Sequence, residues 1–112
     1  MGHRGMDARG DPRTTSLARP VIESISGLMA ALADPTRIAM VDALRRGGAN
    51  VQQLADELDL PHRNASHHAL VLHRAGILSR RREGREIVYS VEDWAAWWLI
   101  GQAAGIYAED DG

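Results

Sequence analysis

The chain has 112 residues, 45% of them hydrophobic and 25% charged, and a net charge of −2, which is ordinary for one globular domain with a single core. No apolar run approaches the roughly 18 residues of a membrane-spanning helix, and the N-terminus has no apolar segment typical of a secretory signal, so we expect a cytoplasmic location. The absence of cysteine excludes disulfides, thiolate metal sites and thiol redox chemistry.

The N-terminal half of the chain predicts a tail and two helices. Residues 1–16 are rich in Gly, Arg and Asp without periodicity, which is typical of a mobile tail. From residue 17 to residue 32, apolar side chains recur with the three- and four-residue spacing of an amphipathic helix. The motif ADPTR ends this helix. Asp34 can cap a second helix, which has Pro35 at its first position and runs to about Arg46, where two glycines end it.

Two more helices and a β-hairpin are predicted next. Asn50 can cap a short helix over residues 51–58, and Gly76 can close the following helix, over residues 62–75. Two runs rich in β-branched residues, ILSRRR and EIVYSV, then flank the tripeptide EGR. Gly84 can supply the turn between them, so these runs predict a hairpin.

The last predicted helix, residues 92–108, contains all three tryptophans, and an acidic tail at 109–112 follows it. The predicted fold class is therefore mainly α with a β-hairpin, in the order α-α-α-α-β-β-α, with one domain over residues 17–108. Large side chains followed by small ones line one stripe of this helix, which favours a close helix-packing face over the alternative, a small-molecule pocket. We interpret the stripe as a dimer interface formed by Trp94, Trp97, Trp98, Gly101 and Gly105.

Four of the five histidines lie in the helix predicted at residues 62–75, which raises the question of a metal site: His62, His67, His68 and His73. No two of them are three or four residues apart, the spacing at which two side chains of one helix can bind one metal ion. His68 shares a face with three alanines and Leu72, so we expect it to point inward as a hydrogen-bonded, half-buried side chain. The outward face carries His62, Arg63, Ser66, His67, Leu70, His73 and Arg74.

Two helices joined by a short turn and followed by an arginine-rich hairpin are typical of a winged helix-turn-helix, whose second helix enters the major groove of DNA. Residues 61–90 contain six arginines and two glutamates, whereas residues 91–112 contain five acidic residues and no base, so the net charge conceals a basic module. Arginines of the hairpin can hold phosphates, and polar side chains of the helix can bond to base edges. The predicted DNA-binding residues are His62, Arg63, Ser66, His67, Arg80, Arg81, Arg82 and Arg85.

Three stretches of the chain also resemble the ArsR/SmtB family of bacterial winged-helix repressors: ALADPTRIAMVDAL, VQQLADELDLPHRNASHHALVLHRAGIL and RREGREIVYSV. The resemblance covers about residues 20–108. It implies a homodimer, joined through the first and last helices, that binds a near-palindromic operator in double-stranded DNA. For many members it also implies release of the DNA when a metal ion binds.

Neither of the two metal sites usual in that family is intact in this sequence. The Cys-x-Cys site falls on Asn50 and Gln52, and neither residue is a thiolate. The site on the last helix, built from two carboxylates and two histidines, falls on Asp93, Ala95, Ile106 and Glu109. Both histidines are lost there, and two carboxylates alone hold a borderline transition metal poorly.

An N-terminal chelate is the remaining candidate for a metal site. If Met1 is removed, the free amine of Gly2 lies beside the imidazole of His3, a combination that can chelate nickel. Some family members that sense nickel also begin with Gly-His. The sequence therefore predicts that no cofactor is required. Nickel is the alternative, held by Gly2, His3, Asp93 and Glu109.

The leading interpretation is a homodimeric, sequence-specific DNA-binding transcriptional regulator. The alternatives are a nickel-responsive sensor of the same fold and a protein-interaction partner of another regulator. Four arginines in the hairpin argue against a pure docking module, which has no need of a phosphate-binding strip. An enzyme is not expected, because the sequence offers no nucleophile–base pair, no phosphate-binding loop and no close-spaced pair of carboxylates.

Overall fold

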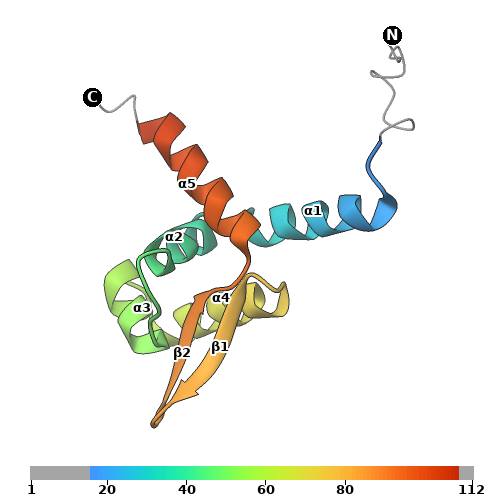
Figure 1. Ribbon diagram of the computed structural model, residues 1–112. Coiled ribbons are helices and arrows are strands. Elements are labelled where there is room, and N and C mark those ends of the chain that lie inside the picture. The colour runs from blue at the N-terminus through green and yellow to red at the C-terminus, as the bar shows by residue number, and fades with distance from the viewer. Residues whose placement is uncertain (1–15, 109–112) are drawn as a thin grey trace.

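The computed structural model describes residues 16–108, which form helices and one β-hairpin (Figure 1). The elements are α1 Arg19–Leu32, α2 Pro35–Leu44, α3 Val51–Leu58, α4 His62–Arg74, β1 Leu78–Glu83, β2 Glu86–Val91 and α5 Trp94–Ala108. The predicted order and fold class are confirmed, and the ends of the elements differ from the predicted ones by a residue or two. None of the helices within the described residues could span a membrane.

The core lies where α2, α3 and α4 meet the hairpin, and α5 packs against α2. The largest side chains that are fully buried there are Met40, Val41, Leu54, Leu72 and Ile77. Burial of a side chain of this size is worth about 1.5–3 kcal/mol, so these residues hold the three helices in place. By contrast, α1 projects away from the body of the protein and contacts chiefly α2 (Figure 1).

Side-chain caps begin α2 and α3, as the sequence predicted. Asp34 accepts a hydrogen bond of 3.1 Å from the backbone N–H of Arg37, and Pro35 is the first residue of α2. This bond, together with the Arg37 guanidinium, lowers the pKa of the Asp34 carboxyl. The cap therefore adds stability above the pKa of the unfolded carboxyl and loses it as the pH falls through the lower folded pKa. At α3, Asn50 and Gln53 each accept a 2.8 Å bond from the other's backbone N–H.

Backbone hydrogen bonds tie the segment between α2 and α3 to the hairpin. Ala49 and Tyr89 exchange two N–H···O bonds, of 3.0 and 2.8 Å, so this segment pairs with the edge of β2 that faces away from β1. Gly48 permits the approach, because a Cβ at this position would lie 2.9 Å from Cγ1 of Val88 and 3.1 Å from the carbonyl oxygen of Tyr89. The hairpin is therefore attached to the helical part of the protein along the edge of β2, in addition to its two chain connections.

The helices α3 and α4 end in the same backbone geometry. After α4, the N–H of Ile77 bonds to the carbonyl oxygen of Leu72 at 3.0 Å, and Gly76 between them has a φ of +82°. After α3, the N–H of Leu60 makes the corresponding bond at 2.9 Å, and Asp59 has a φ of +55°. Both ends need one residue in the left-handed region, which glycine adopts freely and aspartate adopts at a cost.

Substitutions at these two helix ends should change the stability in opposite directions. Gly76→Ala should lower the free energy of unfolding by about 1 kcal/mol, because alanine resists the left-handed conformation. The effect should be purely conformational, since a Cβ at Gly76 would meet no atom within 4 Å. Asp59→Gly should raise the free energy of unfolding by a smaller amount, about 0.5 kcal/mol. Urea denaturation of both variants measures the two shifts, and shifts of the same sign would contradict this account.

Candidate nucleic-acid interface

The helices α3 and α4 form a helix-turn-helix in which α4 presents its N-terminal half to solvent. Ala65, Ala69 and Leu72 of α4 are fully buried, and the helix contacts α2 and α3 along this edge. The opposite side of α4 therefore faces outward. Three of the predicted DNA-binding residues on that side are exposed, namely His62, Arg63 and His67. The fourth, Ser66, is half-buried.

Asn64 adds an exposed side-chain amide next to Arg63, and it was not among the predicted DNA-binding residues. An asparagine amide can pair with adenine through two hydrogen bonds, which makes it suited to base reading. The sequence could have identified this residue, because it places a side-chain amide on the first turn of the second helix of the helix-turn-helix. Helical periodicity assigned Asn64 to neither face, because it lies between the buried and the outward stripes.

His68 points inward, as predicted. Its Nδ1 lies 3.4 Å from Nη1 of Arg37, whose Nε donates to the carbonyl oxygen of Ala31 at 2.7 Å and whose Nη1 lies 3.9 Å from Asp34. Because a guanidinium can only donate, Nδ1 of His68 accepts, and the ring carries its proton on Nε2. Arg37 thus connects the end of α1, the start of α2 and the inner side of α4.

His73 points toward the hairpin, so the prediction that it lies on the outward face is wrong. Its Nδ1 lies 3.0 Å from the carbonyl oxygen of Leu78, and its ring stands edge-on to that of Tyr89, with 6.4 Å between the ring centroids. The residue lies on a flank of α4, and the hairpin covers that flank. Helical spacing alone could not reveal this, because it carries no information on which flank another element covers.

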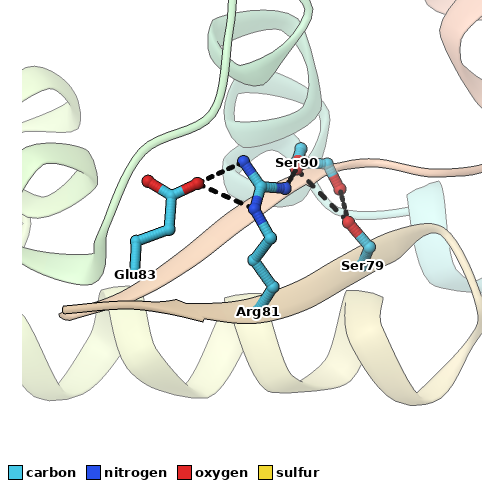
Figure 2. Close-up of polar contacts among 4 residues, drawn as sticks. All are labelled: Ser79, Arg81, Glu83 and Ser90. Carbon is cyan, nitrogen blue, oxygen red and sulfur yellow. Dashed lines mark hydrogen bonds and ion pairs between the residues drawn. The ribbon is translucent and has the colours of Figure 1, made fainter. Parts of the chain in front are cut away.

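The hairpin arginines divide between its two faces; we call β1, β2 and their turn the wing. Arg80 and Arg82 share the face that turns toward the core, since the antiparallel register pairs them with core-packing residues of β2, Tyr89 and Ile87. Arg81 lies on the opposite face, where its guanidinium pairs with Glu83 (Figure 2), and Arg85 follows Gly84 in the turn. All four arginines are exposed, but they occupy both faces and the tip of the wing and do not form a single strip.

The predicted stripe on α5 divides into two parts. Trp94 and Trp98 stack with their ring centroids 6.3 Å apart and are 68% and 47% exposed. Trp97 lies instead under Arg45, the residue that directly follows α2. The guanidinium carbon of Arg45 is 4.6 Å from the centroid of the Trp97 ring. Gly101 faces the same arginine, because a Cβ there would lie 2.5 Å from Nη2 of Arg45. Gly101 therefore serves a close contact within the chain, whereas a Cβ at Gly105, the remaining member of the stripe, would meet no atom within 4 Å.

Large apolar side chains stand exposed along α1 and α5. Four of them follow the amphipathic spacing of α1 and are 42–48% exposed, namely Val21, Ile22, Ile25 and Met29. Together with the stacked tryptophans, they form apolar surface that the single chain does not cover. Apolar surface of this extent and regularity is typical of a protein–protein interface.

The described residues do not fit a metal site. Within residues 16–108, no group of three His, Cys, Asp or Glu side chains is placed to hold a metal ion. Of the predicted ligands, Gly2, His3 and Glu109 lie outside the described residues. Asp93 caps α5, because its Oδ1 accepts a hydrogen bond of 2.8 Å from the N–H of Ala95. The nickel alternative stays a prediction.

The chain is similar to known regulators in sequence and fold. It matches the helix-turn-helix domain family over residues 32–81. It is 34% identical to the HTH-type transcriptional repressor SmtB of Mycobacterium tuberculosis, over 82% of this chain and 68% of that protein. It is 32% identical to the HTH-type transcriptional regulator NmtR of the same organism, over 92% of this chain and 84% of that protein.

A solved structure shows the same fold. It is the homodimeric winged helix-turn-helix DNA-binding domain of a possible ArsR-family transcriptional regulator from Mycobacterium bovis. The TM-score is 0.74 at 21% sequence identity, and the match covers 86% of this chain and 89% of that one. The arrangement of four helices, wing and last helix is therefore shared with a protein that carries a DNA-binding domain.

Proposed function

The chain belongs to the ArsR/SmtB family of winged helix-turn-helix transcriptional regulators, and from that premise we propose that it binds a near-palindromic operator as a homodimer. The relatives that it matches are transcriptional regulators and not enzymes. The observation that carries the proposal is the outward N-terminal half of α4, where exposed polar side chains stand on a helix that the core holds rigidly.

In this proposal the N-terminal turns of α4 enter the major groove. Arg63 can pair with guanine and Asn64 with adenine, each through two hydrogen bonds, while Ser66 and His67 reach a base edge or a phosphate. Within the described residues, Arg63 makes no hydrogen bond or ion pair, so it gives up no partner when it binds DNA. The histidines of α4 therefore belong to a DNA-reading helix and not to a metal cluster.

The wing supplies contacts with the phosphate backbone. Arg80, Arg82 and Arg85 are exposed and, in the part of the chain that the structure describes, form no ion pair. Each arginine that meets a phosphate releases counterions from the DNA, which favours binding independently of the sequence. The net charge of −2 does not oppose this, because these arginines belong to the wing, and the wing projects at one end of the molecule (Figure 1).

A second copy of the chain buries the apolar side chains that α1 and α5 leave exposed. The exposed apolar face of α1 and the stacked tryptophans of α5 are suited to a two-fold symmetric contact, in which each patch meets its counterpart. Such a dimer carries two α4 helices at a fixed separation. A pair of recognition helices related by a two-fold axis reads two half-sites about one turn of DNA apart.

Operator binding should depend steeply on salt. Each protomer has three wing arginines that are unpaired within residues 16–108. A dimer can therefore make about six phosphate contacts, and its affinity should fall by about three decades between 50 and 200 mM salt. Fluorescence anisotropy should use a duplex selected from a random library with the protein itself, and a scrambled duplex of the same composition. Equal affinity for the two duplexes would show that the protein is not a sequence-specific regulator.

Arg63→Ala should weaken operator binding by about 1–3 kcal/mol and relax the preference at one base position in each half-site. The matched control is Arg74→Ala, which removes the same charge from the last turn of α4, away from the base-reading end. This control should weaken operator and scrambled duplexes to a similar, smaller extent. Quantitative selection with both variants measures the base preferences, and unchanged preferences in Arg63→Ala would place the reading surface elsewhere.

Ile25→Glu should convert the dimer to a monomer, because it places a charge in the apolar face of α1. The side chain is 42% exposed in the single chain, so the substitution should leave the fold of the protomer intact. Ala30→Glu, on the opposite, exposed side of α1, is the control and should leave the dimer unchanged. Sedimentation velocity at micromolar concentration measures the oligomeric state of both variants. A dimeric Ile25→Glu variant would rule out α1 as part of the interface.

A further inference from the structure

The helix α5 is held to the body of the protein along its first two turns only. Its buried residues, Ala96 and Ile100, lie one turn apart, and none of the described residues 101–108 is buried. The rest of the helix extends beyond the body (Figure 1). Apolar packing is not directional, so two buried side chains in one short row do not by themselves fix the angle of a helix.

Arg45 supplies a second point of attachment beside this row. Its guanidinium carbon lies 4.6 Å from the centroid of the Trp97 ring, and a Cβ at Gly101 would lie 2.5 Å from its Nη2. Trp97 and Gly101 are four residues apart, so the guanidinium lies along one turn of α5. If α5 turns in one direction, the contact with Trp97 opens, and if it turns in the other, its backbone meets the guanidinium.

Hydrogen bonding does not account for the position of Arg45. Its side chain is half-buried, and Nη1 lies 3.4 Å from Oδ1 of Asp42, one turn earlier in the chain. Nε is buried and, within residues 16–108, has no hydrogen-bond partner, which costs free energy. The contact with the Trp97 ring offsets this cost, because a cation held over an indole and partly shielded from water is attracted to it.

We propose that Arg45 is a positioning residue, which sets the distance between the two recognition helices of the operator-bound dimer. The inference rests on the proposed function, in which the stacked tryptophans of α5 meet a second copy. Both α4 and α5 pack on α2, so the angle of α5 on α2 decides how far α4 lies from the two-fold axis. Because the axis relates the two protomers, the same displacement occurs in both.

The contact of Arg45 should therefore oppose binding to half-sites at the wrong spacing. One base pair added between the half-sites moves the second by about 3.4 Å and rotates it by about 35°. The dimer can engage both half-sites of this shifted duplex only if α5 moves on α2 and the contact breaks. On a duplex with the original spacing, the contact is intact both before and after binding, so its strength cancels from that affinity.

The test compares Arg45→Ala with the wild-type protein on three duplexes by fluorescence anisotropy. The matched duplex is selected from a random library with the wild-type protein, the shifted duplex has one more base pair between the half-sites, and the third keeps a single half-site. Arg45→Ala should raise the affinity for the shifted duplex by about three- to fivefold. Its affinities for the matched duplex and for the single half-site should change by about twofold at most, since neither requires α5 to move.

Arg46→Ala is the matched control. It removes the same charge from the next residue, whose guanidinium pairs with Glu57 of α3, so it should change the affinities for the matched and shifted duplexes alike. Gly101→Ala reaches the same contact from α5, because the new Cβ displaces the guanidinium from Trp97. This variant should reproduce the effect of Arg45→Ala and should add nothing in the Arg45→Ala background.

The outcomes separate this inference from the proposed function. An Arg45→Ala variant with the wild-type ratio of affinities for the shifted and matched duplexes would overturn the inference alone. So would a monomeric Arg45→Ala variant in sedimentation velocity, because the residue would then serve assembly and not spacing. A wild-type protein that binds the matched duplex no better than the single half-site would overturn both.

Discussion

The close packing of α4 on the core is the constraint on which the candidate site depends. Ala65 and Ala69 give the helix a buried edge of methyl groups, so its axis can lie close to α2 and α3, and Leu72 fills the core beneath it. The polar contact between His68 and Arg37 adds a fixed point on the same side. A helix held along one edge in this way cannot rotate, and its opposite side, which carries Arg63, is therefore presented to solvent in a single orientation.

The wing belongs to the same rigid unit as α4. The backbone bonds between Ala49 and Tyr89 attach β2 to the segment before α3, and the contact of His73 with the carbonyl oxygen of Leu78 attaches α4 to β1. A phosphate held by the wing thus has a defined position relative to the bases in front of α4. A contact between the wing and a phosphate can therefore depend on how α4 is seated on the bases, although the contact itself carries no sequence information.

Two features of the single chain fit the assembly with DNA and a second copy that we propose. The apolar side chains of α1 follow the spacing of an amphipathic helix, yet that face and the stacked tryptophans of α5 are exposed in the single chain. The arginines of the wing lack partners, apart from the one that Glu83 holds, within the part of the chain described by the structure. In the proposed assembly, a second copy of the chain buries the exposed apolar side chains, and DNA phosphates pair with the wing arginines. The hydrophobic effect then drives dimerisation, and electrostatic attraction drives DNA binding.

The sequence by itself determined the elements of this protein and their order, because the interactions that begin and end them are local. The caps of Asp34 and Asn50 and the turns at Gly76 and Gly84 involve residues only a few positions apart, and the inward direction of His68 follows from neighbours on its own helix. Only the tertiary structure decided which flank of α4 the hairpin covers, that Arg45 lies against α5, and which face of the wing turns toward the core. These outcomes join residues far apart in the chain, and they depend on how whole helices and strands pack, about which local spacing carries no information.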